Sequence, residues 1–283
     1  MARSKSITRS RIGVIILICG FGLGVAFQKW VTVGRVIRWL APGHSTAQDI
    51  PRPAGLENDS TLCLLVAGQS NAASHGRPRG RAGEGVYALT AEGWFPAVDP
   101  FPGGSGFGGS VWTRLGPMLR HRSLTEQVVI GCVAQGSSSL SAWAPGGGLE
   151  PLYRRLGDRF EAERLEIDAL IWHQGETESW RNDADSACYR ENLERLIDAW
   201  QQRFPGVPIV ICQTSRDPEG RVNPGIRGAQ RAVCEREGVH VGPDTDALGD
   251  KFRHDQVHWN EAGMRVFAEE LMTTLKDILQ TGS

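Results

Sequence analysis

Side chains that could carry out chemistry occur in four short clusters of this sequence. GQSN at 68–71, QGSSS at 135–139 and HQGE at 173–176 each follow a short apolar run, and HDQVH at 254–258 precedes the last helix-like segment. The clusters supply hydroxyl, amide, carboxylate and imidazole groups together with glycines. These are the groups that acyl transfer by a serine nucleophile requires.

A serine hydroxyl is a weak nucleophile until a neighbouring base removes its proton, and histidine has a suitable pKa for that role. Ser70 and His258 could form such a pair. Asp255 lies three residues before His258, so it could accept a hydrogen bond from the imidazole and fix its tautomer. The backbone N–H groups of Ser70 and Gly136, with a side-chain amide, could stabilise the oxyanion.

The elements that must position these clusters follow from the hydrophobic pattern. Short apolar runs rich in β-branched residues lie at 62–67, 128–134, 169–172 and 207–213. Helix-like segments lie between or after them, at 149–165, 188–204, 225–238 and 261–279. This pattern predicts an α/β protein whose parallel sheet is covered by helices on both faces. Ligands bind beyond the carboxyl ends of the strands in such sheets, so we expect the four clusters at one shared edge.

The composition fits one folded domain and limits the choice of partner. The chain has 283 residues, of which 40% are hydrophobic and 22% charged, and its formal net charge is -1. The near-neutral charge gives no reason to expect nucleic acid as a partner. There is no CxxC motif, and Cys63, Cys132 and Cys212 fall within apolar runs, so we expect buried free thiols rather than disulfides.

The N-terminal segment differs from the rest of the chain. Basic residues precede an uncharged apolar run at 12–27. This pattern predicts that residues 1–37 are an uncleaved signal anchor or a cleaved signal peptide, with membrane contact through the apolar run and an extracytoplasmic location. Residues 38–60 are predicted to be a linker, and residues 61–283 the folded domain.

Taken together, the clusters resemble the SGNH hydrolase family, in particular its sialate O-acetylesterase branch, which is related to the acetylxylan esterases of the sixth carbohydrate esterase family. GQSN resembles the nucleophile block, QGSSSLSAW at 135–143 the glycine block, WHQGETES at 172–179 the HQGE block and DQVHWN at 255–260 the final DxxH block. The blocks occur in the family's order. The resemblance implies a three-layer α/β/α fold with a parallel, flavodoxin-like sheet.

The resemblance also implies a role for each matching residue. Ser70 would be the nucleophile, His258 the base and Asp255 the carboxylate that orients it. Gly136 would give an oxyanion-hole N–H beside that of Ser70, and Gln174 would take the place of the asparagine that other SGNH enzymes use. The resemblance implies neither a metal nor an organic cofactor.

Two roles stay open at this point. Ser137 stands where the glycine block usually has a second glycine, so the N–H of either Gly136 or Ser137 could face the oxyanion. In related acetylxylan esterases the glutamate of the HQGE block has been considered as the acid member, so Glu176 is the alternative to Asp255.

Each of these residues also has a simpler interpretation. Ser70 could only cap a helix, and His173 and Glu176 could only hold the backbone of the site in place. His254 and His258 are four residues apart and could bind zinc with Glu176 if they lay on a helix. No HExxH motif is present and the segment is typical of a loop, so we expect no metal site.

We predict a serine esterase of the sialate O-acetylesterase or acetylxylan esterase type, which removes O-acetyl groups from carbohydrate through an acetyl-enzyme. Trp143, Asn71 and Gln69 are the predicted substrate contacts, and the glycine-rich loop at 80–109 is predicted to shape the pocket. The alternatives are an SGNH lipase or thioesterase for longer acyl chains and a non-catalytic carbohydrate-binding relative. The intact serine and histidine argue against the last.

Overall fold

We describe the protein from a computed structural model, which defines residues 48–56, 60–122, 124–181 and 186–281. These residues belong to one unit of the chain, Gly43–Ser283. The predicted signal segment at 1–37 lies outside them and stays a prediction. Within the described ranges, no helix is long and apolar enough to cross a membrane.

A seven-stranded sheet forms the centre of this unit, in the order β3-β2-β4-β1-β5-β6-β7. Its strands are β1 (Thr61–Gly68), β2 (Val86–Leu89), β3 (Trp94–Pro96), β4 (Gln127–Ala134), β5 (Ala169–His173), β6 (Ile209–Gln213) and β7 (Val239–Asp244). All neighbours pair in parallel except β2 and β3. The five strands from β4 to β7 in this order follow the flavodoxin-like arrangement, and β2 and β3 extend the sheet beyond β4.

The antiparallel pair β2–β3 corrects the expectation of a parallel sheet at this edge, and it shows that the predicted glycine-rich loop at 80–109 contains two short strands. β2 and β3 are joined by a tight turn in which the Thr90 N–H donates to the Gly93 carbonyl at 2.9 Å. A hairpin this short can only pair its strands antiparallel, because a parallel connection needs a crossover of a dozen or more residues.

The alternation of side chains along β1 builds a core on each face of the sheet. Leu62, Leu64 and Val66 belong to one buried cluster, whereas Cys63, Leu65 and Ala67 belong to the other. Both faces are therefore apolar, which explains why the strand appears in the sequence as a continuous hydrophobic run.

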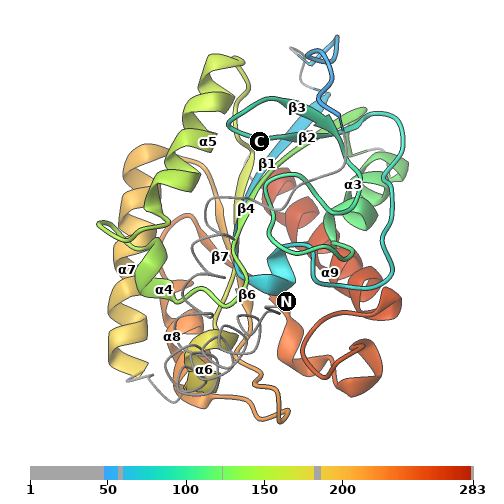
Figure 1. Cartoon of the computed structure of the whole chain (residues 1–283). Helices are drawn as coiled ribbons and strands as arrows, with labels where there is room; N and C mark the ends of the chain where they lie inside the picture. The colour runs from blue at the N-terminus through green and yellow to red at the C-terminus, as the bar shows by residue number, and fades with distance from the viewer. Residues whose placement is uncertain (1–47, 57–59, 123, 182–185, 282–283) are drawn as a thin grey trace, which may run out of the picture. The chain divides into compact units, whose positions relative to one another are not determined.

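Helices cover both faces of the sheet, giving three layers (Figure 1). On one face lie α3 (Trp112–His121) and α9 (Glu261–Thr281), and on the other lie α4 (Leu140–Trp143), α5 (Glu150–Ala162), α7 (Ser186–Arg203) and α8 (Pro224–Val233). The short α6 (Glu176–Arg181) follows β5, and single 3-10 turns form η1 (Ser70–Ala72), η2 (Thr245–Ala247) and η3 (Asp250–Phe252). The three-layer expectation is confirmed for the described residues.

The local sequence explains where two of these helices begin. The Asn223 side chain accepts from the N–H groups of Gly225 and Ile226 at the start of α8. The Asn260 side chain accepts from the Gly263 N–H at 3.0 Å at the start of α9. Because Asn260 lies two residues after His258, this cap also fixes the chain directly beyond the predicted base.

Part of the predicted linker packs on the domain. Ile50 forms a bridge with Trp94 of β3, and Arg52 forms an ion pair with Glu163 at 3.0 Å. Leu56 is buried. Residues 48–56 therefore extend the folded unit rather than form a free tether.

The cysteines of the described ranges are free thiols, as expected. Cys63, Cys132 and Cys212 are buried, whereas Cys188 is exposed. Burial raises the pKa of the Cys63 thiol to about 12, so this group stays protonated and unreactive at neutral pH.

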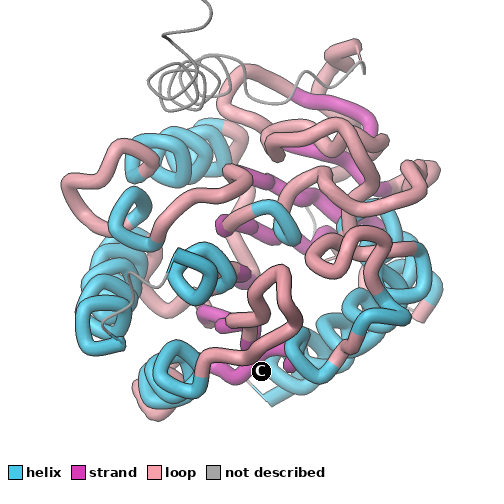
Figure 2. The backbone as a smooth tube through the Cα atoms, turned by 60° about the horizontal axis from the view of Figure 1, so that its bottom comes forward, coloured by secondary structure: helices cyan, strands magenta, loops and turns pink. Residues whose placement is uncertain are grey.

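Strands β1 and β5 lie side by side where the strand order reverses, and the loops that follow the strands gather over this edge (Figure 2). Gly68 at the end of β1 pairs with His173 at the end of β5. Its φ of +152° suits glycine, and an added Cβ would collide with the His173 carbonyl.

We therefore expect Gly68→Ala to lower the free energy of unfolding by about 3 kcal/mol or more, because the collision involves backbone and cannot be relieved by a rotamer change. Urea unfolding followed by circular dichroism measures this. Gly93→Ala is the control, since nothing lies within 4 Å of an added Cβ there. Equal stabilities of the two variants would show that the β1–β5 contact does not require glycine.

Candidate active site

Ser70 lies in the tight turn that follows β1. The carbonyl of Gln69 accepts from the N–H groups of Ala72 and Ala73, which closes the 3-10 turn η1, and the Ala72 carbonyl accepts from the Trp112 indole at 2.7 Å. Ser70 is 6% exposed. Neither its hydroxyl nor its N–H has a hydrogen-bond partner among the described residues. The turn is thus held from both sides while the serine itself is unengaged.

His258 and Asp255 form a pair, as their spacing predicted. Asp255 Oδ2 lies 2.7 Å from His258 Nδ1, and Asp255 Oδ1 accepts from the N–H groups of Val257 at 3.2 Å and His258 at 2.7 Å. Burial alone would raise the pKa of Asp255, but the hydrogen bonds from His258 lower it below its ordinary value. Because an ionised carboxylate only accepts, the proton of a neutral His258 lies on Nδ1, which leaves Nε2 with the lone pair that a base needs.

The side chain of Asn71 connects the serine turn to this loop. Its Nδ2 donates to the Val257 carbonyl at 3.2 Å and to Glu176 Oε1 at 3.0 Å. Asn71 directly follows Ser70, and Val257 directly precedes His258. No hydrogen bond joins Ser70 to His258 themselves in the described part of the chain, as is common for catalytic pairs without substrate.

Glu176 has no hydrogen bond or ion pair with His258 and is bonded instead to the amide of Asn71. It is buried, Oε1 accepts from the Asn71 amide at 3.0 Å, and Oε2 has no hydrogen-bond partner among the described residues. Burial raises the pKa of Glu176 to about 7, against the opposing effect of the Asn71 hydrogen bond. Of the two carboxylates left open by the sequence, Asp255 is therefore the one beside the histidine.

The rest of the His258 loop is held by its neighbours. The Arg253 guanidinium donates to the carbonyls of Thr245 and Val257 and stacks over the Trp259 ring at 4.1 Å. Trp259 in turn stacks on His173, with ring centroids 6.4 Å apart. Burial lowers the pKa of His173 to about 3, so this histidine is neutral and acts as a packing surface beneath the loop.

The predicted oxyanion donors differ in how they are engaged. The Ser70 N–H is unengaged, as described above, whereas the Gly136 N–H donates to Ser105 Oγ at 2.7 Å. Gln174 is buried, and its amide donates to the Ser138 carbonyl at 3.2 Å and to the Glu178 carboxylate. The Gly136 N–H and the Gln174 amide must therefore each leave their present acceptor before they could donate to an oxyanion.

Trp143, a predicted substrate contact, is enclosed in this structure. It is fully buried, its indole donates to Ser138 Oγ at 2.8 Å, and its ring packs edge-on against Trp172. The Trp143 side chain packs in the apolar core between α4 and the sheet, and a short sequence motif does not show this burial. The other two predicted contacts are also buried: Gln69 accepts from the Thr177 N–H at 3.2 Å, and Asn71 makes the bridge described above.

Two residues that the sequence analysis did not assign lie in the site. The His75 ring stacks on His258 with centroids 5.1 Å apart, and His75 Nε2 lies 3.3 Å from Ser105 Oγ. A Cβ added to Gly136 would lie 2.9 Å from His75 Nε2. His75 comes five residues after Ser70 in the same segment, which was a usable signal; Ser105 belongs to a glycine-rich loop with no local pattern.

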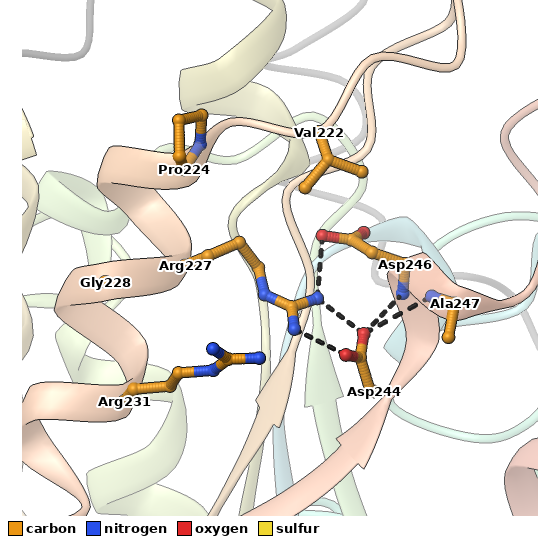
Figure 3. A pocket seen from close by; sticks show the side chains of 8 residues that line it. All are labelled: Val222, Pro224, Arg227, Gly228, Arg231, Asp244, Asp246 and Ala247. Atoms are coloured by element: carbon orange, nitrogen blue, oxygen red, sulfur yellow. Dashed lines mark hydrogen bonds and ion pairs between the residues drawn. The ribbon is translucent and has the colours of Figure 1, made fainter.

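A cavity of about 440 Å³ lies elsewhere, beside β7 and α8 (Figure 3). It is lined by Val222, Pro224, Arg227, Gly228, Arg231, Asp244, Asp246 and Ala247. Arg227 forms ion pairs with Asp244 at 2.5 Å and Asp246 at 3.0 Å, and Asp246 also accepts from the Ser215 N–H at 2.9 Å. These contacts brace the ends of β6 and β7, and none of the predicted site residues lines the cavity.

The three-layer fold and the serine, histidine and carboxylate clusters at one sheet edge fit the resemblance to the SGNH hydrolases. The sequence model of the family "Carbohydrate esterase, sialic acid-specific acetylesterase" matches residues 60–277. The chain therefore belongs to this family of carbohydrate esterases. A search of curated protein sequences gave no match.

Solved structures share the fold. An Arabidopsis thaliana protein is 20% identical with a TM-score of 0.63, covering 77% of this chain and 98% of its own. NanS is 14% identical with a TM-score of 0.59, covering 79% and 98%. A carbohydrate acetylesterase from Xanthomonas citri is 16% identical with a TM-score of 0.56, covering 78% and 57%.

The buried carboxyl of Glu176 predicts a pH dependence of stability. Its pKa is raised on folding, so its contribution is fully present below the ordinary carboxyl pKa of about 4.3 and is lost as the pH rises through about 7. We expect the free energy of unfolding to fall by a few kcal/mol across this window relative to that of Glu176→Gln, since each pKa unit corresponds to about 1.4 kcal/mol.

Urea unfolding between about pH 5 and pH 8 measures this difference. Glu92→Gln, which changes an exposed carboxylate in the β2–β3 turn, should follow the wild-type profile. If Glu176→Gln has the same pH profile as the wild-type protein, then Glu176 is ionised in the folded state throughout this window and the assignment is wrong.

Proposed function

We propose that the protein is a serine esterase that removes O-acetyl groups from carbohydrate. Membership of the carbohydrate esterase family supports the reaction class. The observation that carries the assignment to residues is the Asn71 bridge, which holds the turn of Ser70 against the loop of the His258–Asp255 pair. A nucleophile, a base and a carboxylate are thereby supplied at one edge of the sheet.

In the proposed acylation step, Ser70 Oγ attacks the acetyl carbonyl carbon and its proton passes to His258 Nε2. The tetrahedral intermediate then collapses, the bond to the sugar oxygen breaks, and His258 returns the proton to that oxygen. Asp255 stays ionised and stabilises the imidazolium through Nδ1. The products of this step are the free sugar hydroxyl and acetyl-Ser70.

Deacylation uses the same groups. His258 Nε2 removes a proton from water, the resulting nucleophile attacks the acetyl carbonyl, and acetate leaves as Ser70 Oγ recovers its proton. The Ser70 N–H is the first oxyanion donor in this scheme, and the Gly136 N–H joins it when it leaves Ser105 Oγ. Side chains, backbone N–H groups and water carry every step of the scheme.

The crowding around Gly136 supports acetyl over longer acyl groups. The His75 ring lies against both Gly136 and His258, and Ser105 occupies the space in front of the Gly136 N–H. These side chains limit the room beside the predicted oxyanion site, where the acyl chain of a bound ester would extend. The methyl group of an acetyl ester would displace the His75 and Ser105 side chains less than a longer acyl chain would.

Hydrolysis of 4-nitrophenyl acetate, butyrate and octanoate by the full-length protein tests the proposal, together with acetate release from acetylated xylan and O-acetylated sialic acid. We expect kcat/KM to fall steeply with acyl length, and Ser70→Ala to lower kcat by a factor on the order of 10⁴ or more. Acetate release from only one of the two carbohydrates would also assign the sugar class.

Ser141→Ala is the matched control, because Ser141 is exposed and, among the described residues, its hydroxyl contacts only Ser139 Oγ. It should retain wild-type turnover, and circular dichroism should show that both variants are folded. Preference for the octanoate would favour a lipase or thioesterase instead. A folded wild-type protein without turnover on any of these esters would contradict the catalytic proposal.

A further inference from the structure

We propose that the His258 loop is also an inhibitory binding site for a transition-metal ion such as Zn²⁺, with His254, Asp255 and His258 as its ligands. The effect on turnover rests on the proposed esterase function, whereas metal binding itself does not.

The three side chains already converge. One ligand atom from each lies within 4.8 Å of the others. Asp255 Oδ2 is 2.7 Å from His258 Nδ1 and 3.8 Å from His254 Nδ1. Zinc binds imidazole nitrogen and carboxylate oxygen at about 2.0–2.2 Å, so one ion can span these separations with a small movement of the rings. The side chains are partly exposed, at 19%, 42% and 22% in sequence order, so an ion can reach them from solvent.

The hydrogen bond of His254 leaves the correct nitrogen available. His254 Nε2 lies 3.0 Å from the His75 carbonyl oxygen, which can only accept, so the proton of a neutral His254 is on Nε2. The lone pair of Nδ1 then faces Asp255 Oδ2, another acceptor, with no hydrogen between them. A cation bound between His254 Nδ1 and Asp255 Oδ2 would remove the repulsion between these two acceptors. A second ring nitrogen bonded to a backbone carbonyl is the usual outer contact of a metal-binding histidine.

The backbone preorganises the two rings. The His254 N–H donates to the His258 carbonyl at 2.9 Å, and the rings stack with centroids 6.1 Å apart. This ligand set differs from the one considered from the sequence, in which His254 and His258 would lie on a helix and bind zinc together with Glu176. The segment is a loop, and Glu176 is buried beneath Asn71.

Metal binding would remove the base from the proposed reaction. His258 Nδ1 must give its lone pair to the ion, so the ring proton moves through solvent from Nδ1 to Nε2. No electron is transferred and the proton count of the ring is unchanged. Nε2 then carries a hydrogen and cannot accept the Ser70 proton, and Asp255 is bound to the ion instead of the imidazole.

The test uses the full-length, untagged protein in a Cys188→Ser background, because the exposed Cys188 thiol could bind zinc separately. Zinc chloride is titrated by calorimetry near pH 7.5, and inhibition of 4-nitrophenyl acetate hydrolysis is measured in parallel and reversed with EDTA. We expect one zinc ion per chain at the concentration that inhibits.

His254→Gln is the decisive variant, since its side-chain amide can still donate to the His75 carbonyl but lacks the Nδ1 ligand. With inhibition expressed relative to the variant's own zinc-free turnover, zinc affinity and inhibition should both weaken by roughly 10–100-fold. His240→Gln is the matched control, since His240 is near the start of β7, at the opposite edge of the sheet, and should behave as the parent.

Equal inhibition of His254→Gln and the parent, or no zinc binding by the parent, would overturn the proposal. Zinc binding that depends on His254 in a protein without esterase activity would support the metal site and reject the proposed function instead. The two proposals can therefore fail separately.

Discussion

The amide of Asn71 joins two segments that are far apart in the chain, and the geometry of the whole site depends on this bridge. It is buried and donates to both Glu176 and the Val257 carbonyl, so the Ser70 turn cannot move away from the His258 loop without losing the hydrogen bond to Val257. A hydrogen bond of this kind contributes about 0.5–1.5 kcal/mol. The amide thus favours one relative placement of nucleophile and base, although the two do not touch directly.

The sheet makes this bridge possible. β1 and β5 pair in parallel and end level with each other, so the turns after Gly68 and His173 begin side by side. The first turn presents Ser70 and Asn71, and the second presents Glu176 at the start of α6. The His258 loop reaches the same edge because α9 packs along the face below it and the loop immediately precedes that helix.

The sequence predicted what is local or continuous. β1, β4 and β5 were placed within about a residue of their ends, because burial on both faces leaves an unbroken apolar run. The contact between Asp255 and His258 was predictable because they lie three positions apart within one turn. β2, β3 and β7 were missed, because β2 and β3 are too short to show a period and β7 is interrupted by glycine and proline.

Long-range packing could not be predicted. Asn71 and Glu176 are 105 residues apart, and no local pattern shows that they meet. Trp143 follows a polar block, which favoured a place in the cleft, but only the assembled α4 and sheet show that it is enclosed.

The central claim is that Ser70 is a nucleophile activated by His258 and Asp255. Its most direct test is labelling of the wild-type protein with a fluorophosphonate, followed by mass spectrometry. We expect one adduct, on Ser70, that forms far more slowly in His258→Ala and Asp255→Asn than in Glu176→Gln. An adduct on another residue, or labelling of Asp255→Asn at the wild-type rate, would contradict it.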